Sequence, residues 1–411
     1  MYQLNQYSQS WVPSANGSMF PVQNIPFGIF SDQQSRRACS RIGDYIVDLS
    51  KLADKNLFDE TGCNVETLKG PVLNSFISQG KGVTGKFRLR LAEILDLQNE
   101  NIFRDAVQDC LISVEQCVLH LPLNIGDYTD FYSSREHATN VGIMFRDPAN
   151  ALLPNWLHLP VGYHGRASSI VVSGHKIKRP HGQIIPKEGE PPILAASRQV
   201  DFELEMAFVV GKENEMGNSI PLSEARDHIF GLMLFNDWSA RDIQKWEYVP
   251  LGPFLAKNFA STVSPWIVTL EALDAFRTEG PVQSPKPLDY LTPESKRNFD
   301  IHLEVFLNNK LISESNAKYL YWSISQQLAH HTVNGCNMKV GDLCASGTIS
   351  GPDEKSYGSM LELCWKGTKP ISMDDGSTRT FIQDGDQVTM KAFAKNDHYC
   401  IGFGECSGVV V

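Results

Sequence analysis

Three features are missing from this sequence, and each absence argues against a class of protein. Nine cysteines are scattered without any Cys-x-x-Cys pair, so the usual zinc spacing is absent and reduced thiols are favoured. The longest apolar runs, such as 229–235, fall far short of the roughly 20 residues that cross a bilayer. The first 35 residues contain no Lys or Arg, which a secretory leader or transit peptide would need. We therefore expect a cytoplasmic protein.

Basic charge and nucleotide motifs are also scarce. The chain has 47 Asp and Glu against 37 Lys and Arg, and its net charge is −10. Such a chain repels nucleic acid and anionic lipid, so we expect neither as a partner. The glycine-rich turns at 162–166 and 347–351 match neither a P-loop nor a dinucleotide fingerprint. No Gly-x-Ser-x-Gly motif occurs, so serine-nucleophile chemistry is not indicated.

The sequence does contain enough apolar material for two domains. It has 411 residues, of which 42% are hydrophobic. Short β-like runs at 25–30, 38–42 and 45–49 are followed, from 87 to 117, by apolar residues at helical spacing. We predict a small N-terminal β domain closed off by helices, residues 1–118.

Residues 119–411 are predicted to form a large, mainly β C-terminal domain. Its β-branched or alternating runs are separated by Gly, Pro and Asn clusters and lie at 168–173, 201–210, 299–307 and 387–392. Helical patterns are few, near 239–248 and 322–331.

The strongest chemical signal is the acid-rich run DFELEMAFVV at 201–210. On a strand, Asp201, Glu203 and Glu205 would share one face and the apolar side chains the other. That face can simply be the solvated side of an edge strand. Here, however, the acids lead into apolar residues 207–210, and acids crowded beside a core repel one another unless a cation compensates them. A carboxylate set without Cys or paired His fits a hard ion, Mg²⁺ or Ca²⁺.

A further acid, Asp237, follows the apolar run 229–235. It can cap the next helix, line a site, or do both. Asp237, Arg241, Gln244 and Tyr248 are spaced four, three and four residues apart, which places them on one helical face. The alternative is a solvated face. An acid, a guanidinium, an amide and a phenol that follow a buried strand favour the wall of a site.

His137 and Lys257 are two more candidates. His137 ends a polar, turn-rich segment, 126–137, that also holds acids and aromatic residues, although most histidines are structural or lie at the surface. Lys257 lies among apolar residues at 252–259. It can extend to water or, if buried, pair with a carboxylate or donate to an oxyanion.

Three segments resemble the fumarylacetoacetate hydrolase family nearly word for word: DYTDFYSSR at 127–135, NDWSARDIQ at 236–244 and ASGTISGP at 345–352. The resemblance extends over essentially the full length. It implies an SH3-like N-terminal barrel, a C-terminal β-roll that houses the site (the FAH fold), and a homodimer. It also implies an enzyme that hydrolyses a C–C bond of the dicarboxylate diketone 4-fumarylacetoacetate. The products would be fumarate and acetoacetate, in the last step of tyrosine and phenylalanine catabolism.

The same resemblance implies roles for individual residues. His137 would be the general base, oriented by Glu362 on a strand at 361–363, and Arg241, Gln244 and Lys257 would stabilise the oxyanion. The catalytic metal would be held by Asp130, Glu203, Glu205 and Asp237. Substrate contacts would come from Tyr132, Arg146, Tyr163, Gln244, Tyr248 and Thr348. A second, structural Mg²⁺ would lie near Asp237, Lys257 and Ser261, where Ser261 replaces a threonine of the family and keeps the hydroxyl.

The expected mechanism is attack by a water that His137 deprotonates, while the metal chelates the diketone and acetoacetate leaves as an enolate. Two alternatives remain. Related enzymes of the same superfamily act as acylpyruvate hydrolases, decarboxylases or isomerases, and a non-catalytic relative could keep the metal site alone.

Overall fold

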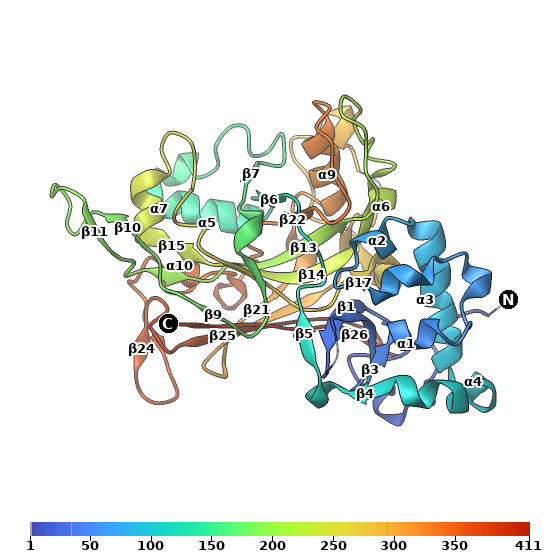
Figure 1. Cartoon of the computed structure of the whole chain (residues 1–411). Helices are drawn as coiled ribbons and strands as arrows, with labels where there is room; N and C mark the ends of the chain where they lie inside the picture. Colours follow the sequence, from blue (N-terminus) through green and yellow to red (C-terminus); the bar gives the residue numbers. More distant parts are fainter. Residues whose placement is uncertain (1, 34, 294) are drawn as a thin grey trace.

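The N-terminal part is built on a five-stranded antiparallel sheet, in the order β4-β3-β2-β1-β5. The computed structural model describes residues 2–33, 35–293 and 295–411 (Figure 1). The strands of this sheet are β1 (Phe27–Ser31), β2 (Arg37–Ile42), β3 (Tyr45–Asp48), β4 (Leu111–Ser113) and β5 (Val118–His120). The three predicted runs form its centre, and the chain returns to it through residue 120.

Helices pack beside this sheet, as predicted, but over a different range. They are α1 (Leu49–Ala53), α2 (Asn74–Ile77), α3 (Lys81–Leu95) and α4 (Glu100–Val107). Phe87 and Leu91 on α3 are fully buried, and the Phe87 ring lies 4.1 Å from that of Phe58 and 5.3 Å from that of Phe76. The predicted helical stretch was wrong after residue 110, because β4 and β5 return there to pair with β3 and β1.

Two large sheets form the C-terminal part, and the predicted mainly β class is confirmed. The larger sheet runs β7-β6-β22-β13-β14-β16-β8, with β17 also paired to β14, and the smaller runs β21-β20-β25-β26-β9. The larger sheet contains β6 (Tyr128–Phe131), β7 (Gly162–His164), β8 (Ile170–Val172), β13 (Leu204–Val210), β14 (Ile229–Asp237), β16 (Ser261–Val263), β17 (Val268–Thr269) and β22 (Leu343–Ala345). The smaller contains β9 (His175–Ile177), β20 (His302–Leu307), β21 (Lys310–Asn316), β25 (Gln387–Lys395) and β26 (Cys400–Val410).

Short two-stranded ribbons and helices complete this part. The ribbons are β10 (His181–Ile184) with β11 (Ile193–Ala196), β12 (Val200–Asp201) with β15 (Ser239–Ala240), β18 (Arg277–Thr278) with β19 (Asn298–Phe299), and β23 (Ile371–Ser372) with β24 (Thr378–Arg379). The helices are α5 (Arg135–Phe145), α6 (Ala225–His228), α7 (Arg241–Glu247), α8 (Leu270–Leu273), α9 (Ile324–Thr332) and α10 (Met360–Leu363). The helices predicted at 239–248 and 322–331 are confirmed as α7 and α9. In Figure 1, α5, α7 and α9 lie above β13, β14 and β17 of the larger sheet.

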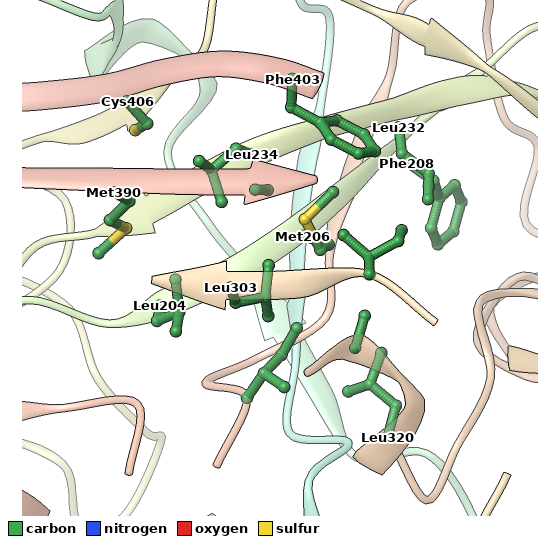
Figure 2. Close-up of a cluster of buried hydrophobic side chains, with 14 of the residues drawn as sticks. Leu204, Met206, Phe208, Leu232, Leu234, Leu303, Leu320, Met390, Phe403 and Cys406 are labelled. Atoms are coloured by element: carbon green, nitrogen blue, oxygen red, sulfur yellow. The ribbon is translucent and has the colours of Figure 1, made fainter. Parts of the chain in front are cut away.

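The main core lies between the two large sheets. Figure 2 shows Leu204, Met206 and Phe208 of β13 among apolar side chains that include Leu303 and Met390 of the smaller sheet. The intervening residues Ala207 and Val209 belong instead to the core of the N-terminal part. Both faces of β13 are therefore buried, as is usual for a central strand. The same face that carries Ala207 and Val209 carries Glu203 and Glu205 at its other end.

The N-terminal and C-terminal parts are packed together directly. Phe27 of β1 pairs with Ile267, and its ring lies 5.9 Å from that of Phe230 on β14.

All nine cysteines are free thiols. Within residues 2–33, 35–293 and 295–411, no helix combines the length and the apolar character needed to cross a membrane.

Candidate metal centre and active site

Four carboxylates meet where three strands of the larger sheet run close together. Asp130 lies on β6, Glu205 on β13 and Asp237 at the end of β14, while Glu203 stands immediately before β13. Each offers an oxygen, and these oxygens all lie within 4.8 Å of one another. All four side chains are buried. The strand order β6-β22-β13-β14 brings the residues together, although Asp130 is distant from the others in sequence.

The electrostatics of this cluster are those of a cation site. Burial and the neighbouring carboxylates raise the pKa values of Asp130 and Glu205 well above their ordinary range. Among the described residues, Asp130 Oδ1 and Glu205 Oε1 have no hydrogen-bond partner. Buried like charges with unpaired oxygens are costly unless a cation compensates them. The donor set is all oxygen and fits a hard divalent ion.

Lys257 and Ser261 lie on one side of the cluster. The Lys257 ammonium donates to Glu203 and, at 2.6 Å, to Asp237. The Ser261 hydroxyl on β16 donates to the other oxygen of Asp237 at 3.0 Å. Burial alone would lower the pKa of Lys257, but Asp237 and Glu203 raise it above its ordinary value. A protonated ammonium has no lone pair, so a contact between Lys257 and an ion would have to use the backbone carbonyl.

Arg241, at the start of α7, is held by three side chains. Its Nε donates to Asp201 at 2.7 Å, and its Nη1 lies 2.7 Å from Glu203 and donates to Gln244 at 3.1 Å. Burial alone would raise the pKa of Glu203, but Lys257 and Arg241 lower it to about 2. Arg241 Nη2 is buried and has no partner among the described residues. This rigid guanidinium therefore has one spare donor nitrogen.

The prediction that Asp201 shares the acidic face with Glu203 and Glu205 is corrected by the structure. The strand is interrupted at Phe202: Asp201 lies on β12, which pairs with β15, and β13 begins only at Leu204. The Asp201 carboxylate accepts from the Arg241 guanidinium and from the backbone N–H groups of Met360 and Leu361. It lies outside the four-carboxylate cluster and positions Arg241.

His137 and Glu362 form a buried pair. His137 Nδ1 lies 2.6 Å from Glu362 Oε2, and the two side chains are 4% and 0% exposed. The Ser134 hydroxyl caps the start of α5 by accepting from the His137 backbone N–H. The Tyr132 ring lies edge-on to the imidazole at 5.3 Å. His137 is thus held through both its backbone and its ring.

Glu362 lies on the short helix α10, so the predicted strand at 361–363 was wrong. Ser359 caps this helix and also donates to Glu362 Oε2 at 2.8 Å. Ser350 and Asn140 donate to the same carboxylate at 2.9 and 2.8 Å. Burial alone would raise the pKa of Glu362, but His137 and these hydrogen bonds hold it below its ordinary value. The carboxylate is fully paired.

Sequence reasoning missed Asn140, Ser350 and Ser359. A signal existed for Ser359, because Ser-x-x-Glu is the pattern of a helix N-cap and would have placed Glu362 on a helix. Asn140 lies three residues after His137, one turn along α5. Nothing in the local sequence connects Ser350 to Glu362.

The residues expected to bind substrate fall into two groups. Tyr132, Tyr163, Gln244 and Thr348 line the buried centre or its edge: the Tyr163 hydroxyl donates to Asp237 at 3.3 Å, and the buried Thr348 hydroxyl has no partner among the described residues. Arg146 and Tyr248 are exposed, and Tyr248 is 47% accessible. The structure places Tyr163 against the four-carboxylate cluster and Gln244 against Arg241, whereas Arg146 and Tyr248 are exposed.

The assembled centre can perform acid–base chemistry beside a cation. A carboxylate-oriented imidazole suits proton transfer near neutral pH. A guanidinium with a spare donor suits an oxyanion, and four acids suit a Lewis-acidic metal. These groups lie in one buried centre, because Glu203 of the cluster pairs with Ser359 through the backbone and the Ser359 hydroxyl donates to Glu362.

Known proteins that match this chain over almost its whole length belong to the family that the sequence resembles. The family model described as fumarylacetoacetate (FAA) hydrolase C-terminal matches residues 127–411, and the one described as fumarylacetoacetase N-terminal matches residues 23–122. The fumarylacetoacetase of Homo sapiens is 52% identical over 417 residues, covering 98% of both chains. That of Dictyostelium discoideum is 50% identical over 420 residues, again covering 98% of both. A solved fumarylacetoacetate hydrolase from the psychrophile Exiguobacterium antarcticum matches with a TM-score of 0.55 at 17% identity, covering 94% of this chain and 99% of that one; this likeness concerns the fold.

Proposed function

Because the chain belongs to the fumarylacetoacetase family, we propose that it hydrolyses the C–C bond of 4-fumarylacetoacetate to fumarate and acetoacetate, the last step of tyrosine and phenylalanine catabolism. The observation that carries the proposal is the buried His137–Glu362 pair beside four clustered carboxylates. A protein that merely bound metal would not need an imidazole held in this way.

We propose that Asp130, Glu203, Glu205 and Asp237 hold the catalytic ion, Mg²⁺ or Ca²⁺. The fit is supported by the unpaired oxygens of Asp130 and Glu205 and by the excess of buried carboxylates over the two cations Lys257 and Arg241. Ser261 keeps a hydroxyl beside Asp237, as a second, structural ion would need. When bound, the catalytic ion would supply Lewis acidity toward the diketone oxygens.

His137 would act as the general base through its Nε2 atom. The lowered pKa of Glu362 favours its ionised form, to which His137 Nδ1–H would donate across the short contact. Nε2 then carries the lone pair. It can accept a proton from water as the water oxygen attacks the substrate carbonyl carbon, while Glu362 stabilises the imidazolium that forms. The C–C bond then breaks, its electron pair leaves with acetoacetate as an enolate, and the enolate carbon takes up the proton that His137 had accepted from water.

Arg241, Gln244 and Lys257 would stabilise the oxyanion that forms on the attacked carbonyl. The support for Arg241 is its unpaired Nη2, which can donate without giving up the bonds to Asp201 and Glu203. Lys257 already donates to two carboxylates and has one remaining N–H. We expect Arg241 to make the larger contribution.

The substrate carries a carboxylate at each end and therefore needs donors at both. We propose that Tyr132, Tyr163 and Thr348 make contacts near the reacting atoms, since these side chains lie at the centre. Arg146 and Tyr248 are exposed and would bind from the rim, where a guanidinium and a phenol can reach a terminal carboxylate.

We further propose a cytoplasmic homodimer without nucleic-acid or membrane partners. Residues 1–118 would be its N-terminal domain and 119–411 its catalytic domain.

One assay tests the proposal. The purified protein is incubated with fumarylacetoacetate and Mg²⁺, with and without a chelator, and the products are identified. We expect one fumarate and one acetoacetate for each substrate consumed, and loss of turnover with the chelator. Release of CO₂ would instead indicate a decarboxylase, an isomeric product without uptake of water an isomerase, and no turnover a non-catalytic relative.

A further inference from the structure

A concave site lies between α6, α9, residues 289–293 and Arg297. This cleft has a volume of about 500 Å³, and its lining includes none of the residues proposed for the active site. The helices α6 and α9 contact each other, and Figure 1 shows them side by side at one end of the larger sheet. A volume of several hundred Å³ is typical of sites for small organic ligands.

Three arginines line this cleft. Arg226 lies on α6, Arg277 begins β18 and Arg297 immediately precedes β19. Arg277 is paired with Phe299 across the β18–β19 ribbon, and the Arg226 guanidinium lies 5.7 Å from the ring of the same Phe299. The ribbon therefore gathers three positive charges in one place.

Most N–H groups of these arginines have no hydrogen-bond acceptor among the described residues. Arg226 donates to Asp274 at 2.6 Å, Arg277 to the Lys296 carbonyl at 3.2 Å, and Arg297 to the Pro281 carbonyl. A guanidinium has five N–H groups, so each arginine keeps several. The Arg297 Nε is also buried without a partner among the described residues.

The charge of the cleft is opposite to that of the chain. Asp289 is the single acidic residue among the described lining residues, and Asp274, outside the lining, forms an ion pair with Arg226. Arg277 and Arg297 form no ion pair with any described residue, so the cleft keeps an excess of positive charge in a protein whose net charge is −10. A local excess of positive charge in a concave surface attracts anions. The lining also includes Ser323 and Ser325 at the start of α9 and the apolar side chains of Ala329 and Val333.

We propose that this cleft is a binding site for a small organic anion. Its phosphate or carboxylate group would be held by Arg226, Arg277 and Arg297, because guanidinium groups match both anions with paired N–H donors. Its apolar body would lie against Ala329 and Val333. The site is separate from the hydrolytic centre and does not depend on the reaction proposed there.

The test uses three probes of similar size: phenyl phosphate, benzoate and the neutral benzyl alcohol. Isothermal titration calorimetry is carried out on the full-length protein and on the Arg277→Gln variant, with Arg36→Gln as the matched control because Arg36 is an exposed arginine outside the cleft. We expect the native protein and Arg36→Gln to bind at least one of the two anions and not benzyl alcohol. Arg277→Gln should bind that anion about ten-fold more weakly or worse, with unchanged hydrolysis of fumarylacetoacetate.

A second variant tests whether the anion binds in the cleft without changing any arginine. Ser325→Tyr, at a half-buried position in the lining, fills the cleft without removing a charge and should also abolish binding. Tighter binding of phenyl phosphate would identify a phosphate ligand, and tighter binding of benzoate a carboxylate ligand; either supports the site. The proposal is overturned if neither anion binds better than benzyl alcohol, or if Arg277→Gln and Ser325→Tyr bind as the native protein does.

Discussion

The four-carboxylate cluster and Glu362 are both buried, but they differ in how many hydrogen-bond partners their oxygens have. In the cluster, Asp130 and Glu205 each keep an oxygen without a partner, and their pKa values are raised. Four side chains, those of His137, Asn140, Ser350 and Ser359, lie in hydrogen-bond contact with the Glu362 carboxylate, and its pKa is lowered. The first arrangement is incomplete without a cation. The second is complete with the side chains present, and we propose that it orients the His137 imidazole.

The largest effect is expected from His137→Asn. Asparagine keeps a polar group but has no ring nitrogen to accept the proton of water, and loss of a general base lowers kcat by about 10²–10⁴-fold. Steady-state kinetics with fumarylacetoacetate measure this. Metal binding, followed by calorimetry, should be unchanged, because it belongs to the cluster. A variant that turns over within a few-fold of the native rate would remove His137 from the mechanism.

Glu205→Gln should change how much Mg²⁺ stabilises the protein against unfolding, without lowering the stability of the metal-free protein. The metal-free protein should not lose stability, because the change removes a repelled buried charge. Added Mg²⁺ at 100 times its Kd should stabilise the native protein by about 2.7 kcal/mol. The variant should lose most of that gain, and turnover with it. Thermal unfolding with and without Mg²⁺ measures both. An unchanged Mg²⁺ effect would show that Glu205 is not a ligand.

Glu362→Gln, unlike Glu205→Gln, should lower the stability of the protein whether or not Mg²⁺ is present. It should destabilise the protein with or without Mg²⁺, by about 1–3 kcal/mol, since donors that served an ionised acceptor lose it. It should also lower kcat by about 10- to 100-fold, because the imidazole loses its orienting carboxylate, while KM changes little. Denaturant titration and steady-state kinetics are the measurements. A change in KM alone would assign Glu362 to substrate binding.

The stability difference between native protein and Glu362→Gln should depend on pH. The pKa of Glu362 is lowered on folding from its ordinary value of 4.5. Its carboxylate therefore contributes stability above that value, and this contribution disappears as the pH falls through the folded pKa. Unfolding free energies of both proteins across the acid range should converge. A constant difference at all pH values would mean that the Glu362 charge contributes nothing.

The smallest effect is expected from Ser350→Ala. One of several donors to Glu362 is removed, which should cost about 1 kcal/mol of stability and lower kcat slightly at constant KM. Ser168→Ala, at an exposed serine that accepts from Arg166, is the matched control and should leave kcat unchanged. Equal effects of the two variants on kcat would indicate that Ser350 does not position the pair.

Local sequence patterns predicted which side chains share a face of the central strand and where the helix that carries Arg241 lies. The alternation at 201–210 placed Leu204, Met206 and Phe208 in the core and Glu203 and Glu205 on the other face, as the structure has them. The helical spacing at 239–248 predicted α7, which carries Arg241. The strand predicted at 361–363 was wrong, because Ser359 caps a short helix there.

The sequence by itself determined which chemical groups the protein possesses and the conformation of its longest periodic segments, because side-chain spacing reports backbone geometry over a few residues. Only the tertiary structure decided which groups meet. Asp130 joins Glu205 because β6 and β13 both pair with β22, and His137 meets Glu362 because α5 and α10 pack together. The three arginines of the cleft are brought together by α6 and the β18–β19 ribbon. Sheet order and helix packing depend on burial across the whole chain, and no local spacing encodes them.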